Sequence, residues 1–140
     1  MIDPTTGALL LQGDLALDAT LSPRELFQTP LGEGAVPFVF NPPWESFMVR
    51  AVCRDGTPVY MYLFFRDNRL KRVSLHHTVD PSIDEDEVKR RHEAWLRGFL
   101  GEPPSGTPHR YNYAWGQVES EYDPRADSSD VIITYGDPEP

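Results

Sequence analysis

The chain has 140 residues, the size of one domain, and 39% of them are hydrophobic, which is enough to form a core without a metal or a disulfide. The formal net charge is −9, from 22 acidic against 13 basic residues. This negative field would repel phosphate backbones, so we expect no nucleic-acid partner. It suits solubility or a basic protein partner.

No apolar run approaches the ~18 residues that cross a bilayer, and the first residues lack the basic and apolar regions of a secretory signal. We therefore expect no membrane association and a cytoplasmic location. The single cysteine, Cys53, alternates with apolar residues in a predicted strand. This pattern favours a buried, unreactive thiol over a nucleophile.

Short apolar segments at 9–11 and 15–17 flank Gln12-Gly13-Asp14 and predict a small hairpin. A helix should follow, because Ser22-Pro23-Arg24-Glu25 combines a capping box with proline at the first helical position. The helix must end before Pro30.

Residues 32–37 are predicted as a loop and residues 38–40 as a brief edge strand, which Asn41-Pro42-Pro43 interrupts. A three-strand meander is predicted from Ser46 to His76, with tight polar turns at residues 54–56 and 66–69. Its middle strand, 59–65, is almost wholly apolar, so we expect it to be central or covered on both faces.

The clearest helix is predicted from Ser82 to Leu100, with a capping box of Ser82 and Glu85. Gly101 should end it. We expect its apolar stripe to pack on the meander, and a histidine on that stripe to belong to the core. The stripe consists of Val88, His92, Trp95, Leu96, Phe99 and Leu100.

Residues 111–122 are predicted as one strand, with Gly116 as a bulge, and residues 131–135 as the strand that returns. The predicted fold class is α+β: a mostly antiparallel sheet, made of the central meander and a C-terminal hairpin, with one main helix packed on it and a short N-terminal helix. Residues 1–135 should form a single domain, and residues 136–140 a flexible tail.

Catalytic motifs are absent: the sequence has no nucleophile elbow, phosphate-binding loop, dinucleotide fingerprint or paired cysteines. We therefore predict no catalytic residue and no cofactor. A metal site of His76, His77 and Asp80 is one alternative, although adjacent residues of a regular strand point to opposite faces. It would belong to a small hydrolase or metal-dependent enzyme.

Tyrosine and tryptophan cluster near the C-terminus and before the meander. They suit sheet packing, but they also dominate the residues that anchor protein interfaces. The candidate partner-binding residues are Trp44, Tyr111, Tyr113, Trp115 and Tyr122, with Asp123, Asp127 and Asp130 as rim charges.

The segments 113–120, 122–125 and 128–135, together with the Trp95-Leu96 pair, resemble those of small bacterial α+β proteins of unassigned role. The resemblance implies a bacterial cytoplasmic protein and carries no catalytic residue across. In character, the chain is also similar to the immunity proteins that neutralise toxins.

The leading hypothesis is therefore a non-enzymatic protein-interaction module with an acidic, aromatic surface, and toxin neutralisation is one concrete version of it. A small-ligand binding domain, with a pocket between helix and sheet, is a further alternative. The chain is expected to be a monomer or a homodimer, the latter if an apolar sheet face is left exposed.

Overall fold

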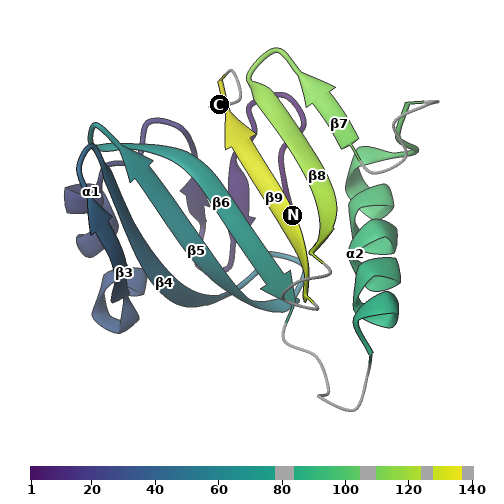
Figure 1. Ribbon diagram of the computed structural model, residues 1–140, viewed down its shortest axis with the longest axis horizontal. Coiled ribbons are helices and arrows are strands. Elements are labelled where there is room, and N and C mark those ends of the chain that lie inside the picture. The colour runs from purple at the N-terminus through teal and green to yellow at the C-terminus, as the bar shows by residue number, and fades with distance from the viewer. Residues whose placement is uncertain (78–83, 105–109, 124–127, 137–140) are drawn as a thin grey trace.

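The computed structural model describes residues 1–77, 84–104, 110–123 and 128–136, and it confirms the α+β class (Figure 1). One large antiparallel sheet holds seven strands in the order β3-β4-β5-β6-β9-β8-β7. Its strands are β3 (Val36–Asn41), β4 (Trp44–Val52), β5 (Pro58–Arg66), β6 (Arg69–His77), β7 (Arg110–Tyr113), β8 (Gly116–Asp123) and β9 (Ser128–Tyr135). The predicted meander is therefore β4, β5 and β6.

The N-terminal elements follow local sequence signals. The predicted hairpin is present as β1 (Leu9–Leu11) and β2 (Leu15–Leu17), and α1 (Pro23–Phe27) begins at the predicted capping box. The backbone N–H of Glu25 donates to the Ser22 hydroxyl oxygen at 3.1 Å, and the Ser22 N–H donates to the Glu25 carboxylate at 3.2 Å. The loop predicted over residues 32–37 is wrong, because a 3₁₀ helix, η1 (Pro30–Gly34), occupies its first half and β3 already begins at Val36, two residues before the predicted edge strand.

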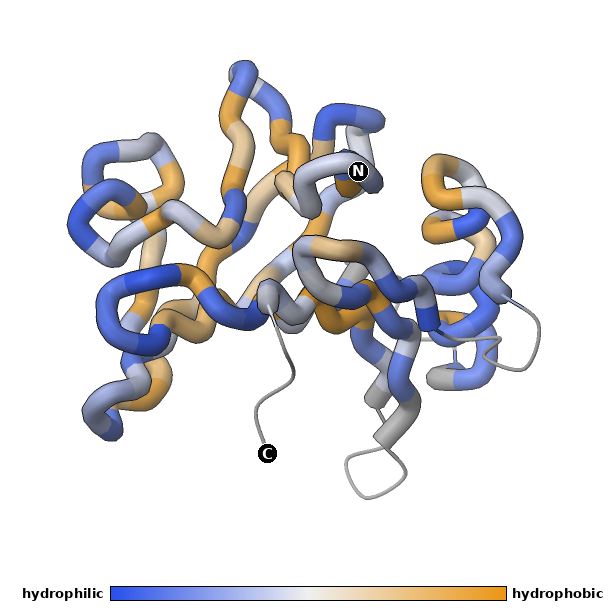
Figure 2. The backbone as a smooth tube through the Cα atoms, turned by 90° about the horizontal axis from the view of Figure 1, so that it is seen from above, coloured by the Kyte–Doolittle hydropathy of each residue, from blue (hydrophilic) through white to orange (hydrophobic). Residues whose placement is uncertain are grey.

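The main core lies on one face of the sheet, which we call the inner face. Side chains of β5 alternate between this face, where they are buried, and the opposite outer face, where they are half-buried. The hairpin β1–β2, helix α1 and the side chain of Ile2 pack against the inner face of the meander. Figure 2 shows the hydrophobic residues gathered along the middle of the molecule and hydrophilic residues in the peripheral turns.

Helix α2 (Glu85–Leu100) has its N-cap two residues later than predicted. Its N-cap is Asp84, whose carboxylate accepts a 2.9 Å hydrogen bond from the backbone N–H of Glu87. The predicted cap, Ser82, lies outside the described residues. A carboxylate directly before the helix satisfies the free N–H groups and complements the helix dipole.

The position of α2 also differs from the prediction, because it packs chiefly against β8 and β9 (Figure 1). It contacts the meander through His92, whose ring lies near that of His76, and through Trp95, which donates to Asp55. On the side of α2 that faces the sheet, Val88, His92 and Leu96 are buried, so His92 is a core histidine as expected. The N-terminal hairpin already covers the inner face of the meander, which leaves the β8–β9 end of the sheet for the helix.

The single strand predicted over residues 111–122 is two strands. The chain reverses at Ala114 and Trp115, so that Tyr113 pairs with Gly116 across a tight turn. Gly116 has a φ of 152°, and a β-carbon there would lie 2.0 Å from the carbonyl oxygen of Thr134. The glycine therefore permits the close approach of β8 to β9 and does not form a bulge.

Candidate functional site

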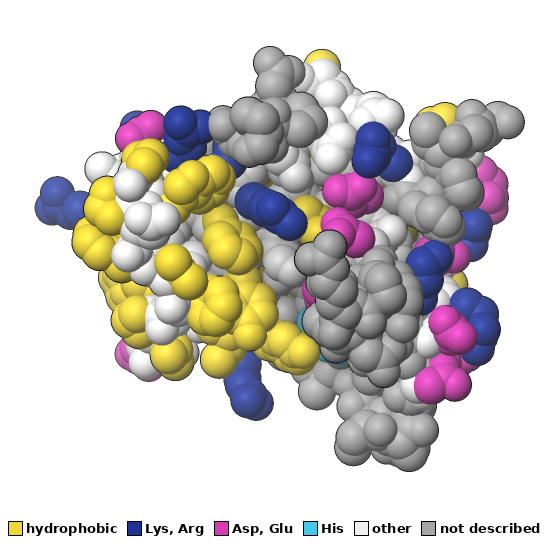
Figure 3. Space-filling model, in the orientation of Figure 1, with side chains coloured by type: hydrophobic (Ala, Val, Ile, Leu, Met, Phe, Trp, Pro, Cys, Tyr) yellow, Lys and Arg dark blue, Asp and Glu magenta, His cyan; other side chains and the backbone are white. Residues whose placement is uncertain are grey.

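The outer face of β3, β4 and β5 carries a group of apolar side chains at the surface (Figure 3). We call this group the aromatic face. Its members are Val36, Phe38, Met48, Tyr60, Tyr62 and Phe64. Phe38 is 56% exposed, and its ring lies 4.7 Å from the ring of Tyr62.

The register of the sheet explains why these side chains meet. Val36 pairs with Met48, and Met48 pairs with Tyr62, so the three lie side by side across three strands. Tyr60 and Phe64 flank Tyr62 on β5, two residues away in each direction. Every second residue of β5 belongs to the core, on the inner face. The other apolar residues of β5 lie on the outer face, which no described element covers over the meander.

Charged side chains border the aromatic face in two separate groups. Exposed Arg50 pairs with Tyr60, and the guanidinium of exposed Arg72 lies 5.9 Å from the ring of Phe64. Farther along the same face, β8 and β9 carry Glu119, Glu121 and Asp130. The outer face of the sheet therefore has an apolar half edged by arginine and a half that carries acidic residues.

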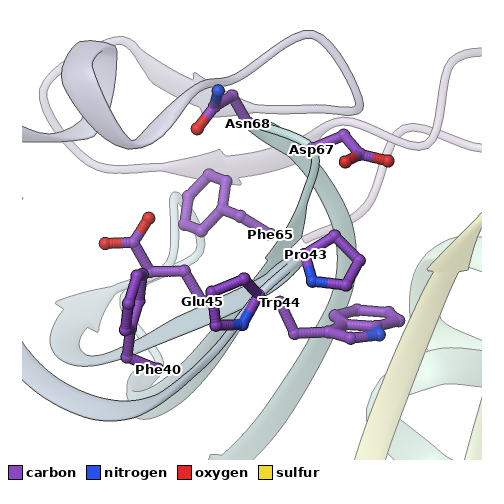
Figure 4. Close-up of a pocket in the computed structure, with 8 residues that line it drawn as sticks. Phe40, Pro43, Trp44, Glu45, Phe65, Asp67 and Asn68 are labelled. Atoms are coloured by element: carbon purple, nitrogen blue, oxygen red, sulfur yellow. The ribbon is translucent and has the colours of Figure 1, made fainter.

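A pocket of about 200 Å³ opens beside the hairpin that joins β3 to β4 (Figure 4). It is lined by Phe40, Pro42, Pro43, Trp44, Glu45, Phe65, Asp67 and Asn68. The guanidinium of Arg66 lies 5.9 Å from the centre of the Trp44 ring. Trp44, predicted from sequence as a partner-binding residue, therefore lies in a pocket that has both aromatic and carboxylate groups.

The other predicted aromatic residues have clear structural contacts. Tyr111 is only 6% exposed, and its hydroxyl donates to the carbonyl oxygen of Gly101 at 2.6 Å. The rings of Tyr113 and Trp115 stack at 5.0 Å, and Trp115 also packs on Tyr135. These contacts join the β7–β8 hairpin to the end of α2 and to the core, and a role for these three residues in partner binding stays a prediction.

The predicted rim charges lie where the structure describes little. Asp127 lies outside the described residues, as do the side chains of Tyr122 and Asp123. Asp130 is described, and one of its carboxylate oxygens is 3.1 Å from Nδ1 of His76. Asp130 thus lies on the outer face but is partly engaged by a neighbouring strand.

His76 is the described member of the predicted metal site. Its Nδ1 is 2.8 Å from the carbonyl oxygen of Ser129, and its ring lies 5.6 Å from the ring of His92 on α2. These contacts tie β6, β9 and α2 together. Asp80 and the side chain of His77 lie outside the described residues. Among the residues that are described, no three histidine, cysteine or acidic side chains are grouped as metal ligands.

His92 and Cys53 are residue types that often take part in catalysis, but both are buried. His92 is 0% exposed, with its Nδ1 3.4 Å from the hydroxyl of Ser129. Cys53 is buried as predicted, and burial raises the pKa of its thiol.

In the described ranges, no helix is long and apolar enough to cross a membrane.

The aromatic face was not predicted as a site. The signals for it were the apolar residues on both faces of β5 and the run Phe38-Val39-Phe40 in a strand predicted to lie at an edge. Neither signal shows which face other elements cover, since that depends on where the N-terminal hairpin and α2 pack.

No protein-family model and no curated protein matches this chain. Among solved structures, the chain is similar in fold to a chain of the structure described as "Rhs1-CT in complex with cognate immunity protein RhsI1", with a TM-score of 0.60. The two sequences are 14% identical, and the similarity covers 96% of this chain and 85% of that chain. At this identity the likeness is one of fold, and it spans nearly the whole chain.

Proposed function

We propose that this protein is a non-enzymatic interaction module that binds a protein partner through the aromatic face, and that it neutralises a toxin in the manner of an immunity protein. The observation that carries the proposal is the exposed aromatic face, with Phe38 packed on Tyr62 at the surface. Contiguous apolar patches of this kind on a soluble protein mark interaction sites.

The chemistry of the face suits a protein partner. Phenylalanine and tyrosine supply large contact areas, and tyrosine is enriched among the few residues that dominate interface affinity. The net charge of −9 would speed the encounter with a basic partner, and the acidic residues of β8 and β9 lie on the same side of the sheet. The aromatic face would then supply affinity and the acidic residues would help to orient the partner.

The fold likeness supports the same proposal. The chain that shares this fold was solved in a complex of Rhs1-CT with its cognate immunity protein RhsI1. A fold of this kind therefore occurs in a complex between an immunity protein and the protein that it recognises.

The test is affinity capture from a lysate of the source organism with three tagged proteins. They are the wild-type chain, the double variant Phe38→Ser/Tyr62→Ser and the variant Tyr113→Ser. We expect the wild-type chain and Tyr113→Ser to retain one protein that the double variant loses. Because Phe38, Tyr62 and Tyr113 are all partly exposed, both variants should keep the circular-dichroism spectrum of the wild type.

The captured protein is then expressed in a host with and without this chain. Growth arrest that is relieved by the wild-type chain, and not by the double variant, is the expected result. A captured protein that does not affect growth would remove the toxin-neutralising role. Retention by the folded double variant and loss by Tyr113→Ser would transfer the interface to the C-terminal hairpin.

A further inference from the structure

Strand β3 is at one end of the sheet order, so one of its long edges pairs with β4 and the other does not pair with any described strand. All six of its residues are exposed, and Phe40 is 75% exposed. The segment Val36–Asn41 holds no charged residue. Edge strands usually carry charge that discourages a further strand, and β3 relies on only a proline and a register shift between Pro37 and Val39.

The contacts of Val39 show which backbone groups face the open edge. Its N–H donates to the Ser46 hydroxyl at 3.1 Å, and that hydroxyl in turn lies 3.4 Å from the carbonyl oxygen of Val39. Both backbone groups of Val39 therefore point toward β4. The backbone N–H and C=O groups of successive residues point to opposite edges of a strand. The N–H and C=O of Phe40 therefore point away from β4, toward the open edge.

The pocket lies at the Asn41 end of this edge, and Phe40 belongs to both (Figure 4). Glu45 and Asp67 bring two carboxylates to the pocket walls, and neither makes an ion pair with any residue that the structure describes. The ring of Phe40 and the carboxylate of Glu45 lie on one side of the pocket and Asp67 lies on the other (Figure 4), so the two acids give the pocket walls a negative charge that suits a cationic side chain.

We infer that the open edge of β3 receives an extended segment of the protein partner, which adds a strand to the sheet and places a lysine or arginine side chain in the pocket. This inference rests on the proposed function and gives the binding mode of its partner. Main-chain hydrogen bonds to Phe40 would supply affinity, and the carboxylates of Glu45 and Asp67 would select the basic residue.

A second copy of this chain fits the edge less well. Its own β3 would bring the segment Val36–Asn41, which has no lysine or arginine for the pocket. Each copy also carries a net charge of −9. The complementary occupant is therefore a basic segment from a different protein.

The test uses a capped six-residue peptide that alternates valine and threonine after an initial lysine, and a second peptide with glutamate in place of the lysine. Each is titrated into the ¹⁵N-labelled full chain at low salt and followed by NMR. We expect the lysine peptide to shift the Trp44 indole N–H and to slow hydrogen exchange at the Phe40 amide. The indole signals of Trp95 and Trp115 serve as internal controls, because these groups donate to Asp55 and Pro4.

Variants separate charge recognition from general electrostatics. Glu45→Gln/Asp67→Asn should weaken binding of the lysine peptide about fivefold or more and bring it level with the glutamate peptide, which is the size expected for losing two exposed charge contacts. The matched control, Glu33→Gln/Asp14→Asn, changes the net charge equally at exposed positions away from the pocket and should bind like the wild type, since Asp14 has a positive φ as Asp67 does.

Three results would overturn the inference: equal binding of the two peptides, shifts confined to residues away from β3, or a dimer by light scattering whose Phe40 amide is protected from hydrogen exchange before any peptide is added. The proposed function is judged separately. A natural partner that needs Phe38 and Tyr62 but binds Glu45→Gln/Asp67→Asn normally would refute the edge mode and leave the proposed function intact.

Discussion

The indole N–H of Trp115 donates a 2.9 Å hydrogen bond to the carbonyl oxygen of Pro4, 111 residues earlier in the chain. The same indole lies against Gly7, and the hydroxyl of nearby Tyr135 donates to the carbonyl oxygen of Gly7 at 2.8 Å. The N-terminal segment is thus fixed to the C-terminal strands by two aromatic side chains. This contact closes the side of the core that the hairpin β1–β2 covers.

Substituting Gly7 by alanine should destabilise the fold by about 2–4 kcal/mol. Gly7 has a φ of 79°, and its new β-carbon would lie 2.5 Å from an indole carbon of Trp115. Gly13→Ala is the matched control, since Gly13 has a φ of 78° but open space around it. Urea unfolding of both variants measures the two effects, and equal losses would show that the indole moves aside at no cost.

Stability should fall as the pH rises above about 10, the pKa of tyrosine in an unfolded chain. Burial raises the pKa of Tyr135 in the folded protein, so above pH 10 the unfolded chain loses a proton that the folded chain keeps. The contribution of the neutral Tyr135 hydroxyl to the free energy of unfolding is complete below pH 10 and declines by about 1.4 kcal/mol per pH unit above it. Burial also raises the pKa of Tyr111 and Tyr113, though both are less enclosed.

The check is urea unfolding of the wild type and Tyr135→Phe between pH 8 and pH 11. The variant should be less stable at pH 8 by about 1 kcal/mol, because it loses the hydrogen bond to Gly7. Its stability should then decline less steeply with pH. Parallel curves for the two proteins would mean that Tyr135 ionises in the folded state without cost.

The thiol of Cys53 should resist modification in the folded protein. It is completely buried in the core, and burial raises its pKa, so both access and thiolate formation are suppressed. Reaction with a disulfide reagent at pH 8 should be at least about a thousandfold slower than in urea, because it requires opening of the core. Rapid reaction of the native protein would show that the core opens near β4.

Removing the cap of α1 should cost about 1 kcal/mol. Ser22→Ala leaves the backbone N–H of Glu25 without its hydroxyl acceptor, whereas Ser22→Thr keeps an acceptor in place. Thermal unfolding should therefore rank the wild type and Ser22→Thr above Ser22→Ala. Equal melting temperatures for all three would show that water replaces the cap at this exposed position.

The sequence by itself determined the elements whose signals are local. The capping box at Ser22, the alternation along β5 and the tight turn at Asp67 and Asn68 all act between residues close in the chain. Asp67 and Asn68 have φ values of 51° and 65°, a conformation that these two residue types tolerate. For the same reason the α+β class and the order of the meander strands could be predicted.

Only the tertiary structure decided which side chains are available to a partner. Tyr111 and Trp115 are residue types that are common at interfaces, yet their side chains bond to the backbone of Gly101 and Pro4. No local sequence pattern specifies those contacts. The aromatic face is exposed because the N-terminal hairpin packs on the inner face of the sheet and α2 takes the β8–β9 end. Residue patterns show that a strand is apolar on both faces, but burial depends on how distant elements share a limited area of sheet.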